Sequence, residues 1–403
     1  MNTLNEVLLA DNEKQTFGMQ LLFKMLGQIQ SGTLEIHSPA GQKYFFQGVA
    51  PGVRVTLQVR DWSFCEDLFL KGDIGLGESY IAKKWDCDHI ENLIIFGISN
   101  KDQLEQFIKG SILRIFSYRL KHLFNRNTKN GSQKNIHAHY DLGNSFYSLW
   151  LDSTMTYSSG LFLSEKDSLE EAQTRKYEAI LNKLELKEGD HILEIGCGWG
   201  GFLEHAAKKG IRVTGVTISK EQYDFALKRI QSYQNLADVQ FCDYRDLKGK
   251  YDHIVSIEMF EAIGEAYWKT YFRKVHSLLR AGGSAVIQSI TINEQDFKSY
   301  RKGTDFIQQY IFPGGMLPSP ERFKIVSEGC GLILNDQLDF GKDYGETLKR
   351  WEVLFSSKIE SVKKINFDER FIRTWRFYLK YCEGGFAAGK IGVSQFKLTK
   401  PKA

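Results

Sequence analysis

Two glutamates stand where an apolar segment ends. The sequence YDHIVSIEMFEAIG, residues 251–264, reads as a buried strand followed by Glu258 and Glu261. An ionised carboxylate in such surroundings is costly unless it is paired, hydrogen-bonded or used in chemistry. Both residues are therefore candidates for a catalytic site. The alternative for Glu261 is an acid at a helix N-terminus, where the helix dipole favours it.

A glycine-rich loop lies earlier in the chain. The segment LEIGCGWGGF places Gly196, Gly198 and Gly200 between a predicted strand and a predicted helix, where the chain turns tightly and approaches a ligand closely. The spacing G-x-G-x-G differs from that of dinucleotide folds, and the loop lacks the lysine of triphosphate-binding loops. It resembles the methyl-donor loop of class I S-adenosylmethionine methyltransferases, with Glu194 leading into it. The alternative is a structural turn.

Other segments predict the rest of the donor site. In VTISKEQ we expect two side chains to reach the ribose or the methionine part of the donor, and in CDYRDL we expect two beside the adenine. The segment TYSSGLF contributes two more. The predicted donor-binding residues of these segments are Tyr157, Ser158, Thr217, Gln222, Asp243 and Tyr244.

The order of the motifs from about residue 135 to 400 resembles that of the cyclopropane-fatty-acyl-phospholipid synthase family. The motifs are HAHYDLGNSFYSLWLDSTMTYSSGLF, LEIGCGWGG, VTGVTISKEQ, DYRDL, SIEMFEAIG, FIQQYIFPGGMLPSP, FGKDYGETLKRW and FYLKYCEGGFAAGKIGVSQFKL. The resemblance implies that the methyl carbon of S-adenosylmethionine is added across the cis double bond of an unsaturated phospholipid acyl chain. The N-terminal half resembles the extra domain of the full-length bacterial synthases, which favours phospholipid as the substrate.

The resemblance also implies how the reaction ends. Methyl transfer to an isolated alkene leaves a carbocation, and a closed apolar cavity with aromatic faces would keep water away from it. Ring closure then needs a base that removes a proton from the added methyl group. The family uses a bound bicarbonate, with Glu261 as its hydrogen-bond acceptor and Tyr344 as a donor. The catalytic residues implied here are Ser159, Glu261, Gln288, Ile290 and Tyr344.

Three positions differ from the best-known bacterial synthases. Ser159 stands in place of cysteine, Gln288 in place of histidine, and Ala262 in place of the histidine that follows the catalytic glutamate. A glutamine side chain donates a hydrogen bond but does not accept a full proton. These residues resemble a branch with plant-type cyclopropane synthases and with lipid methyltransferases that give methylene- or methyl-branched chains. Glu258 has no counterpart among the assigned residues, and we expect it to face the methyl donor in a secondary role.

The pattern of segments predicts an α/β architecture. From Leu184 onward, predicted strands alternate with predicted helices, which indicates a Rossmann-like class I methyltransferase domain with a mainly parallel sheet. Residues 33–60 alternate apolar and polar positions, which predicts a small antiparallel sheet followed by helices. We expect an N-terminal α+β domain for lipid or membrane docking at 1–125, a linker at 126–134 and the catalytic domain at 135–403.

The composition fits this reading. A chain of 403 residues with 42% hydrophobic content exceeds the usual single-domain size, and its charge of +4 does not require a nucleic acid partner. The six cysteines show no CxxC pairing, so we predict no metal site. A non-catalytic lipid-binding relative remains the competing class of protein, although it would be expected to lose the donor loop or Glu261.

The segment 112–134 interleaves apolar residues with cations such as Arg114, Arg119 and Lys121. It is either a helix that packs its apolar stripe on a neighbouring domain or a contact with anionic lipid headgroups. No run approaches about 18 apolar residues. We therefore expect a cytoplasmic protein that binds the inner face of the membrane transiently, and a homodimer is compatible with the resemblance.

Overall fold

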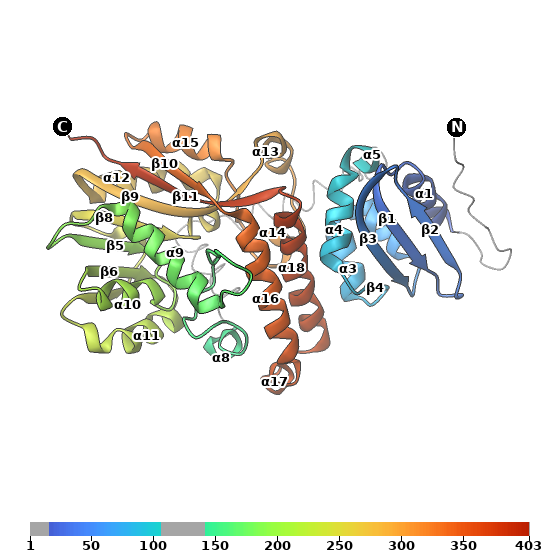
Figure 1. Cartoon of the computed structure of the whole chain (residues 1–403), viewed down its shortest axis with the longest axis horizontal. Helices are drawn as coiled ribbons and strands as arrows, with labels where there is room; N and C mark the ends of the chain where they lie inside the picture. The colour runs from blue at the N-terminus through green and yellow to red at the C-terminus, as the bar shows by residue number, and fades with distance from the viewer. Residues whose placement is uncertain (1–15, 106–141, 403) are drawn as a thin grey trace.

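The computed structural model describes residues 16–105 and 142–402 (Figure 1). The predicted linker 126–134 and the basic segment 112–134 lie outside the described residues. Within the described ranges, no helix combines the length and the apolar character needed to cross a bilayer.

The N-terminal unit is a four-stranded sheet with helices. The apolar residues of its first strand alternate with partly exposed ones, so one face of the sheet enters the core. The sheet order is β2-β1-β3-β4. The elements are α1 (Phe17–Leu26), β1 (Ser31–His37), β2 (Lys43–Gln47), β3 (Ala50–Val59), α2 (Phe64–Lys71), α3 (Asp73–Ile81), β4 (Trp85–Cys87), α4 (Ile90–Ser99) and α5 (Lys101–Glu105).

The prediction of an all-antiparallel sheet at 33–60 is wrong. β1 pairs with β2 in antiparallel fashion but with β3 in parallel, because the chain crosses the start of β1 between β2 and β3. Gly48 makes this crossing, and a Cβ at this position would lie 2.4 Å from the backbone of Gln30 and of Ser31. The two-residue connection between β2 and β3 has the length of a hairpin turn. It nevertheless carries the chain from one edge of β1 to the other.

The catalytic unit contains a seven-stranded sheet of order β10-β11-β9-β8-β5-β6-β7. The pairs from β9 to β7 are parallel, while β11 and β10 add two antiparallel strands at one edge. This confirms the predicted class I methyltransferase fold with a mainly parallel sheet. The strands are β5 (His191–Ile195), β6 (Arg212–Thr217), β7 (Ala237–Phe241), β8 (Tyr251–Ile257), β9 (Leu279–Ile292), β10 (Ile333–Asp339) and β11 (Ile391–Thr399).

Helices cover both faces of this sheet, and a helical layer separates it from the N-terminal unit (Figure 1). The long helices α16 and α18 form that layer and pack against each other. The helices are α8 (Asn144–Tyr147), α9 (Leu169–Leu184), α10 (Gly201–Lys208), α11 (Lys220–Arg229), α12 (Trp268–Leu278), α13 (Glu294–Tyr300), α14 (Phe306–Tyr310), α15 (Pro320–Glu328), α16 (Gly341–Ser357), α17 (Ile359–Lys364) and α18 (Glu369–Ala387).

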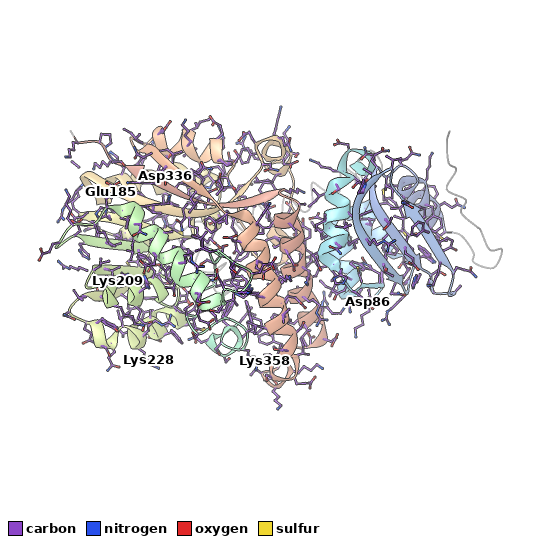
Figure 2. The ribbon with its side chains drawn as sticks, viewed as in Figure 1. Asp86, Glu185, Lys209, Lys228, Asp336 and Lys358 are labelled. Atoms are coloured by element: carbon purple, nitrogen blue, oxygen red, sulfur yellow. The ribbon has the colours of Figure 1, made fainter. Side chains whose placement is uncertain are left out.

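The two units are joined by direct contacts. α4 packs along α18, as Figure 1 shows. Arg373 of α18 donates to Asp86 of β4 at 2.8 Å, with Asp86 labelled in Figure 2, and its guanidinium lies 3.8 Å from the ring centre of Tyr80. The phenol of Tyr381 donates to Asp73 at 2.7 Å. The N-terminal unit is thus held against the helices that line the catalytic site.

Candidate active site

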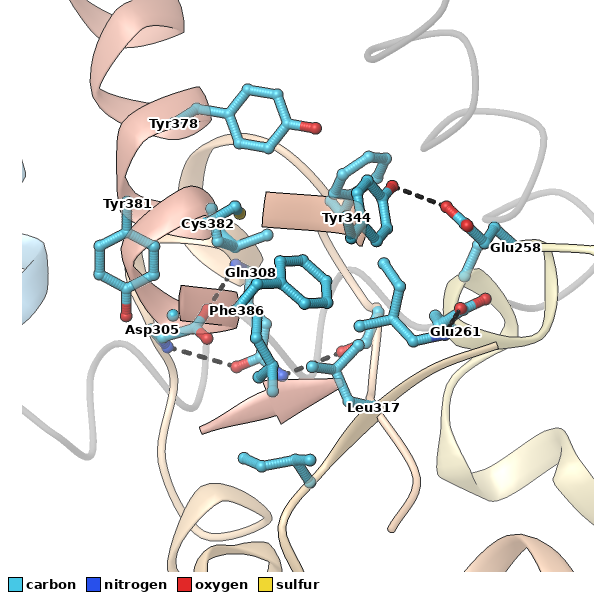
Figure 3. Close-up of a pocket in the computed structure, with 18 of the residues that line it drawn as sticks. Glu258, Glu261, Asp305, Gln308, Leu317, Tyr344, Tyr378, Tyr381, Cys382 and Phe386 are labelled. Carbon is cyan, nitrogen blue, oxygen red and sulfur yellow. Dashed lines mark hydrogen bonds between the residues drawn. The ribbon is translucent and has the colours of Figure 1, made fainter. Parts of the chain in front are cut away.

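One cavity of about 870 Å³ runs from the carboxyl ends of the parallel strands to the N-terminal unit. Ligands of α/β sheets bind at this edge, so its position agrees with the fold. Figure 3 shows part of the wall, in which Tyr378 and Tyr381 of α18 lie across from Glu258 and Glu261, two residues that follow β8. Apolar residues of the N-terminal unit line the far end, including Leu22, Met25, Leu34, Leu57, Phe64 and Phe96.

The glycine loop borders the cavity after β5. Gly198 has a φ of 51°, and a Cβ there would meet no atom within 4 Å, so its Cα faces open space. Gly196 also lines the cavity, but a Cβ on it would meet Met259 at 2.8 Å. Gly200 does not line the cavity, and a Cβ there would lie 3.0 Å from Ala226 of α11. The contact of Gly200 with the methyl donor stays a prediction, and its lack of a side chain allows the loop to pack on α11.

Glu194 lies at the end of β5 beneath this loop. Its side chain is buried and lines the cavity, and its Oε2 atom has no hydrogen-bond partner. Burial raises the pKa of Glu194 to about 8, and the charge of Lys176 opposes that shift. A buried carboxylate with an unpartnered oxygen is suited to a cationic or hydrogen-bond-donating ligand.

The other predicted donor-site residues also line the cavity. The hydroxyl of Thr217 donates to Gln222 Oε1 at 2.9 Å, so these two side chains hold each other. Asp243 accepts a hydrogen bond from Arg245 Nε at 2.8 Å and stands beside Tyr244.

Tyr157 and Ser158 line the same cavity from the segment before α9. The phenols of Tyr157 and Tyr378 lie 2.7 Å apart, within hydrogen-bonding distance. The hydroxyl of Ser158 accepts a hydrogen bond from Lys176 Nζ at 2.6 Å. The Ser158 side chain therefore helps to hold a buried lysine, whereas direct donor binding was expected of it.

Glu258 receives the hydrogen bonds that were predicted for a bound anion. Its Oε1 accepts from the Ser159 backbone N–H at 2.9 Å and from Gln288 Nε2 at 2.7 Å. Its Oε2 accepts from the Tyr344 phenol at 2.6 Å, and the dashed line in Figure 3 marks this contact. Both Glu258 and Tyr344 line the cavity. A secondary role beside the methyl donor was expected of Glu258, and these three hydrogen bonds give its carboxylate a structural place that the sequence did not predict.

Ser159 and Gln288 are fully buried and lie outside the cavity wall. Gln288 Oε1 accepts from Gln395 Nε2 at 3.1 Å, which fixes the amide so that its nitrogen points at Glu258. The register of the strands brings Gln395, Gln288 and Glu258 into line. Gln288 of β9 pairs with Gln395 of β11 on one side and with Ile257 of β8, the residue before Glu258, on the other. Through these hydrogen bonds, Ser159 and Gln288 fix the position of the Glu258 carboxylate.

The backbone at Glu258 is unusual. Its φ is 50°, a left-handed conformation that favours glycine, and its N–H donates to the Gln288 carbonyl at 2.8 Å. Such conformations persist where the surrounding structure determines them, and they are found at functional sites. The turn aims the Glu258 side chain back toward β9 and α16.

Glu261 lies in a short 3-10 helix, Phe260–Ile263, and lines the cavity next to Glu258 (Figure 3). The Ile290 backbone N–H donates to its Oε1, while its Oε2 is buried without a hydrogen-bond partner. The Ile290 N–H, which was predicted to donate a hydrogen bond to bicarbonate, thus donates to Glu261 in this structure. Burial and the charge of Glu258 raise the pKa of Glu261 to about 8.

Lys176 is a buried cation beside the site that the sequence did not lead us to expect. It is fully buried in α9, and burial lowers the pKa of Lys176 to about 8 against the attraction of Glu258, Asp152 and Glu194. Its position was a usable signal, because it falls on the apolar stripe of the helix with Ile180. Its charge compensates the carboxylates that surround the cavity.

The comparisons with known proteins identify the family of this chain. Residues 127–396 match the family of mycolic acid cyclopropane synthetases, which is most of the chain, and the protein belongs to this family. Fold, glycine loop and cavity define an S-adenosylmethionine-dependent methyltransferase.

Two curated relatives cover both units of the chain. The chain is 36% identical to the cyclopropane-fatty-acyl-phospholipid synthase of Escherichia coli over 84% of its length and 86% of that protein. It is 35% identical to the tuberculostearic acid methyltransferase UfaA1 of Mycobacterium tuberculosis over 82% of its length and 79% of that protein. The resemblance to lipid-modifying synthases is confirmed.

A solved structure gives the same picture of the catalytic unit. The mycolic acid cyclopropane synthase CmaA1, in complex with S-adenosylhomocysteine and CTAB, is similar with a TM-score of 0.62 and 31% identity. The match covers 66% of this chain and 98% of that one. The demethylated donor in that complex supports S-adenosylmethionine as the cosubstrate here.

Proposed function

We propose that this enzyme transfers the methyl carbon of S-adenosylmethionine to the cis double bond of an unsaturated phospholipid acyl chain and closes it to a cyclopropane. The observation that carries the proposal is the continuous cavity, which joins the glycine loop to the apolar interior of the N-terminal unit. A polar nucleoside and a hydrocarbon chain need these two environments side by side.

The donor half fits S-adenosylmethionine, which supplies an electrophilic methyl group when bound. The space above Gly198 leaves room for a ligand, and the unpartnered oxygen of Glu194 suits the cationic methionine part. Thr217, Gln222 and Asp243 are proposed to bind the rest of the donor, with Tyr244 beside the adenine.

The acyl half excludes water from the reacting carbon. Tyr378, Phe386 and Phe312 line the cavity near Tyr344, and aromatic faces stabilise a carbocation without attacking it. The ring centres of Tyr344 and Phe386 lie 4.5 Å apart, so the phenol that contacts Glu258 is held in place by packing.

A second product is favoured by the similarity to UfaA1, which is named as a tuberculostearic acid methyltransferase. If a hydride first shifts from the methyl-bearing carbon to the cationic carbon, loss of a proton from the added methyl group gives a methylene branch. Loss of a proton from a neighbouring chain carbon gives an unsaturated chain that carries a methyl branch. We retain a methylene- or methyl-branched acyl chain as the alternative. Which product forms depends on the proton that the base reaches.

The test is to give the purified enzyme vesicles of an unsaturated phospholipid and S-adenosylmethionine. Mass spectrometry is expected to show acyl chains heavier by one CH₂ group, and fragmentation then separates ring from branch. Vesicles of the fully saturated phospholipid are the control and should stay unchanged. Unchanged unsaturated chains, with donor binding intact, would refute the proposed substrate.

The same vesicles test transient membrane binding, which we propose for the basic segment 112–134. Changing Arg114, Arg119 and Lys121 to Glu should weaken sedimentation with anionic vesicles, because each cation near the surface contributes about 1 kcal/mol. Unaltered sedimentation at low salt would move the docking surface elsewhere.

A further inference from the structure

We propose that the Glu258 carboxylate is itself the base that deprotonates the carbocation, in the place that the family resemblance gives to bicarbonate. This inference rests on the proposed function, since it concerns how that reaction ends. Its evidence is the geometry around one side chain.

Three donors converge on Glu258 from three elements. The Ser159 N–H comes from the segment before α9, the Gln288 amide from β9 and the Tyr344 phenol from α16. All three contacts lie between 2.6 and 2.9 Å, the range of charge-assisted hydrogen bonds. These are the groups predicted to hold a bicarbonate ion, and a carboxylate offers the same planar pair of oxygens.

A bicarbonate ion does not fit these residues while Glu258 is present. Ser159 and Gln288 lie behind Glu258, outside the cavity wall, so an ion in the cavity does not reach them. The Ile290 amide, the fourth predicted donor, is engaged by Glu261. A further anion would also lie against two carboxyl groups, while the four predicted donors are already engaged by those groups.

The backbone adds independent evidence. Glu258 occupies a left-handed conformation that a glycine would adopt more easily. A glutamate is retained there at a conformational cost, and its side chain satisfies three donors that would otherwise remain buried without an acceptor. This combination indicates that the carboxylate is built into the site.

The two neighbouring carboxyl groups, Glu258 and Glu261, differ in the surroundings that set their protonation. Burial and the charge of Glu258 raise the pKa of Glu261 to about 8, so Glu261 holds a proton near neutral pH. Burial raises the pKa of Glu258 as well, but Lys176 and three hydrogen bonds favour its ionised form. Two carboxyl groups whose surroundings separate their protonation states are typical of acid and base roles.

The step balances with the residues present. The alkene π electrons form a carbon–carbon bond to the methyl group as the carbon–sulfur bond breaks, which leaves S-adenosylhomocysteine and a carbocation. Oε1 of Glu258 has two donors, whereas Oε2 has one and keeps a lone pair. Oε2 takes a proton from the added methyl group, and the electrons of that C–H bond close the ring. Glu258 becomes a neutral acid and returns the proton to water after product release.

The first experiment compares turnover with and without bicarbonate. Wild-type turnover on unsaturated phospholipid vesicles should be the same in carbonate-free buffer and with added bicarbonate. Glu258→Gln should lose at least about a hundredfold, because the amide keeps the size but is no base. Glu383→Gln is the matched control and should lose about threefold or less, since this buried carboxyl group accepts a hydrogen bond from Lys380 and does not line the cavity.

The second experiment removes the Glu258 side chain, so that a small anion has access to the three hydrogen-bond donors. Glu258→Gly suits the left-handed backbone and frees the three donors. It should be nearly inactive alone and should regain at least about tenfold in turnover with bicarbonate or formate, whereas Glu258→Gln should not respond. Wild-type turnover that rises with bicarbonate, or Glu258→Gln with normal turnover, would overturn the proposal.

A binding measurement separates this proposal from the proposed function. NMR of isotope-labelled bicarbonate should show a bound ion in Glu258→Gly and none in the wild type, whatever the lipid substrate is. A bound ion in the wild type that Tyr344→Phe removes would place bicarbonate in the site and refute Glu258 as its replacement. If the wild type methylates no lipid while the binding contrast holds, the proposed function fails and the assignment of Glu258 to the anion position stands.

Discussion

The two halves of the cavity are built differently. The half beside the glycine loop, where S-adenosylmethionine is proposed to bind, is the methyl-donor half. It has open space above Gly198 and an oxygen of Glu194 without a hydrogen-bond partner. In the base half, the donors of Ser159, Gln288 and Tyr344 already bind a carboxylate of the chain. The difference indicates that the methyl-donor half offers groups to a ligand, whereas the three hydrogen-bond donors of the base half already have an acceptor in the protein.

The largest effect is expected from filling the donor half. Gly198→Val should lower the affinity for S-adenosylmethionine by about a thousandfold or more, because its side chain would occupy the space over the loop and its φ of 51° suits glycine. Calorimetric titration measures this. Gly189→Val is the matched control, since Gly189 is exposed, has a φ of 85° and also meets no atom within 4 Å. Equal losses in both variants would show that backbone strain, and not the ligand, explains the result.

Breaking one contact of the base half should have a smaller effect. Tyr344→Phe removes the donor to Glu258 Oε2 and should lower turnover roughly a hundredfold while leaving donor affinity unchanged. Steady-state kinetics and titration together separate the two effects. Tyr381→Phe makes the same change elsewhere in the cavity wall, where the phenol binds Asp73, and should cost about fivefold or less. A loss in donor affinity equal to the loss in turnover would contradict the division into two halves.

Exchanging a buried positioning residue should cost less still. Gln288→His keeps one donor toward Glu258 and should retain turnover within about tenfold. A histidine can also carry a proton, so the ratio of ring to branched product is the sharper measurement. An altered ratio at unchanged turnover would show that this residue selects the proton that leaves, which the present account assigns to Glu258.

The smallest predicted effect is a proton release in the donor half. Burial raises the pKa of Glu194 to about 8, so the free enzyme holds a proton there at pH 7. A cationic ligand nearby lowers that pKa, and S-adenosylmethionine binding should therefore release up to about one proton. Titrations in two buffers of different ionisation enthalpy measure the release, and Glu194→Gln should abolish it. Proton uptake in the wild type would contradict the assigned environment of Glu194.

The parallel core of the fold was predictable because alternating strand and helix patterns leave few topologies for a chain of this kind. The parallel pairing of β1 with β3 was not predictable, since it depends on the crossing at Gly48, which in sequence looks like an ordinary turn. Patterns of burial indicate strands, whereas pairing across a turn depends on backbone contacts that no periodicity records.

The position of the predicted methyl-donor residues along the cavity was largely predictable, because most of them follow successive strands of one sheet. The sequence did not indicate that Gly200 packs on α11 or that Ser158 binds Lys176. The base half was harder, because Glu258 meets partners separated from it by 99, 30 and 86 residues. The family resemblance named those partners, but only the structure shows that they converge on a side chain of the protein.

The most direct test of this account is a crystal structure with S-adenosylhomocysteine, grown in the presence of bicarbonate. We predict that the Glu258 carboxylate lies within hydrogen-bonding distance of the Ser159 N–H, the Gln288 amide and the Tyr344 phenol, while S-adenosylhomocysteine lies over Gly198. A planar anion bound to those three donors, with the Glu258 side chain turned away, would contradict the account.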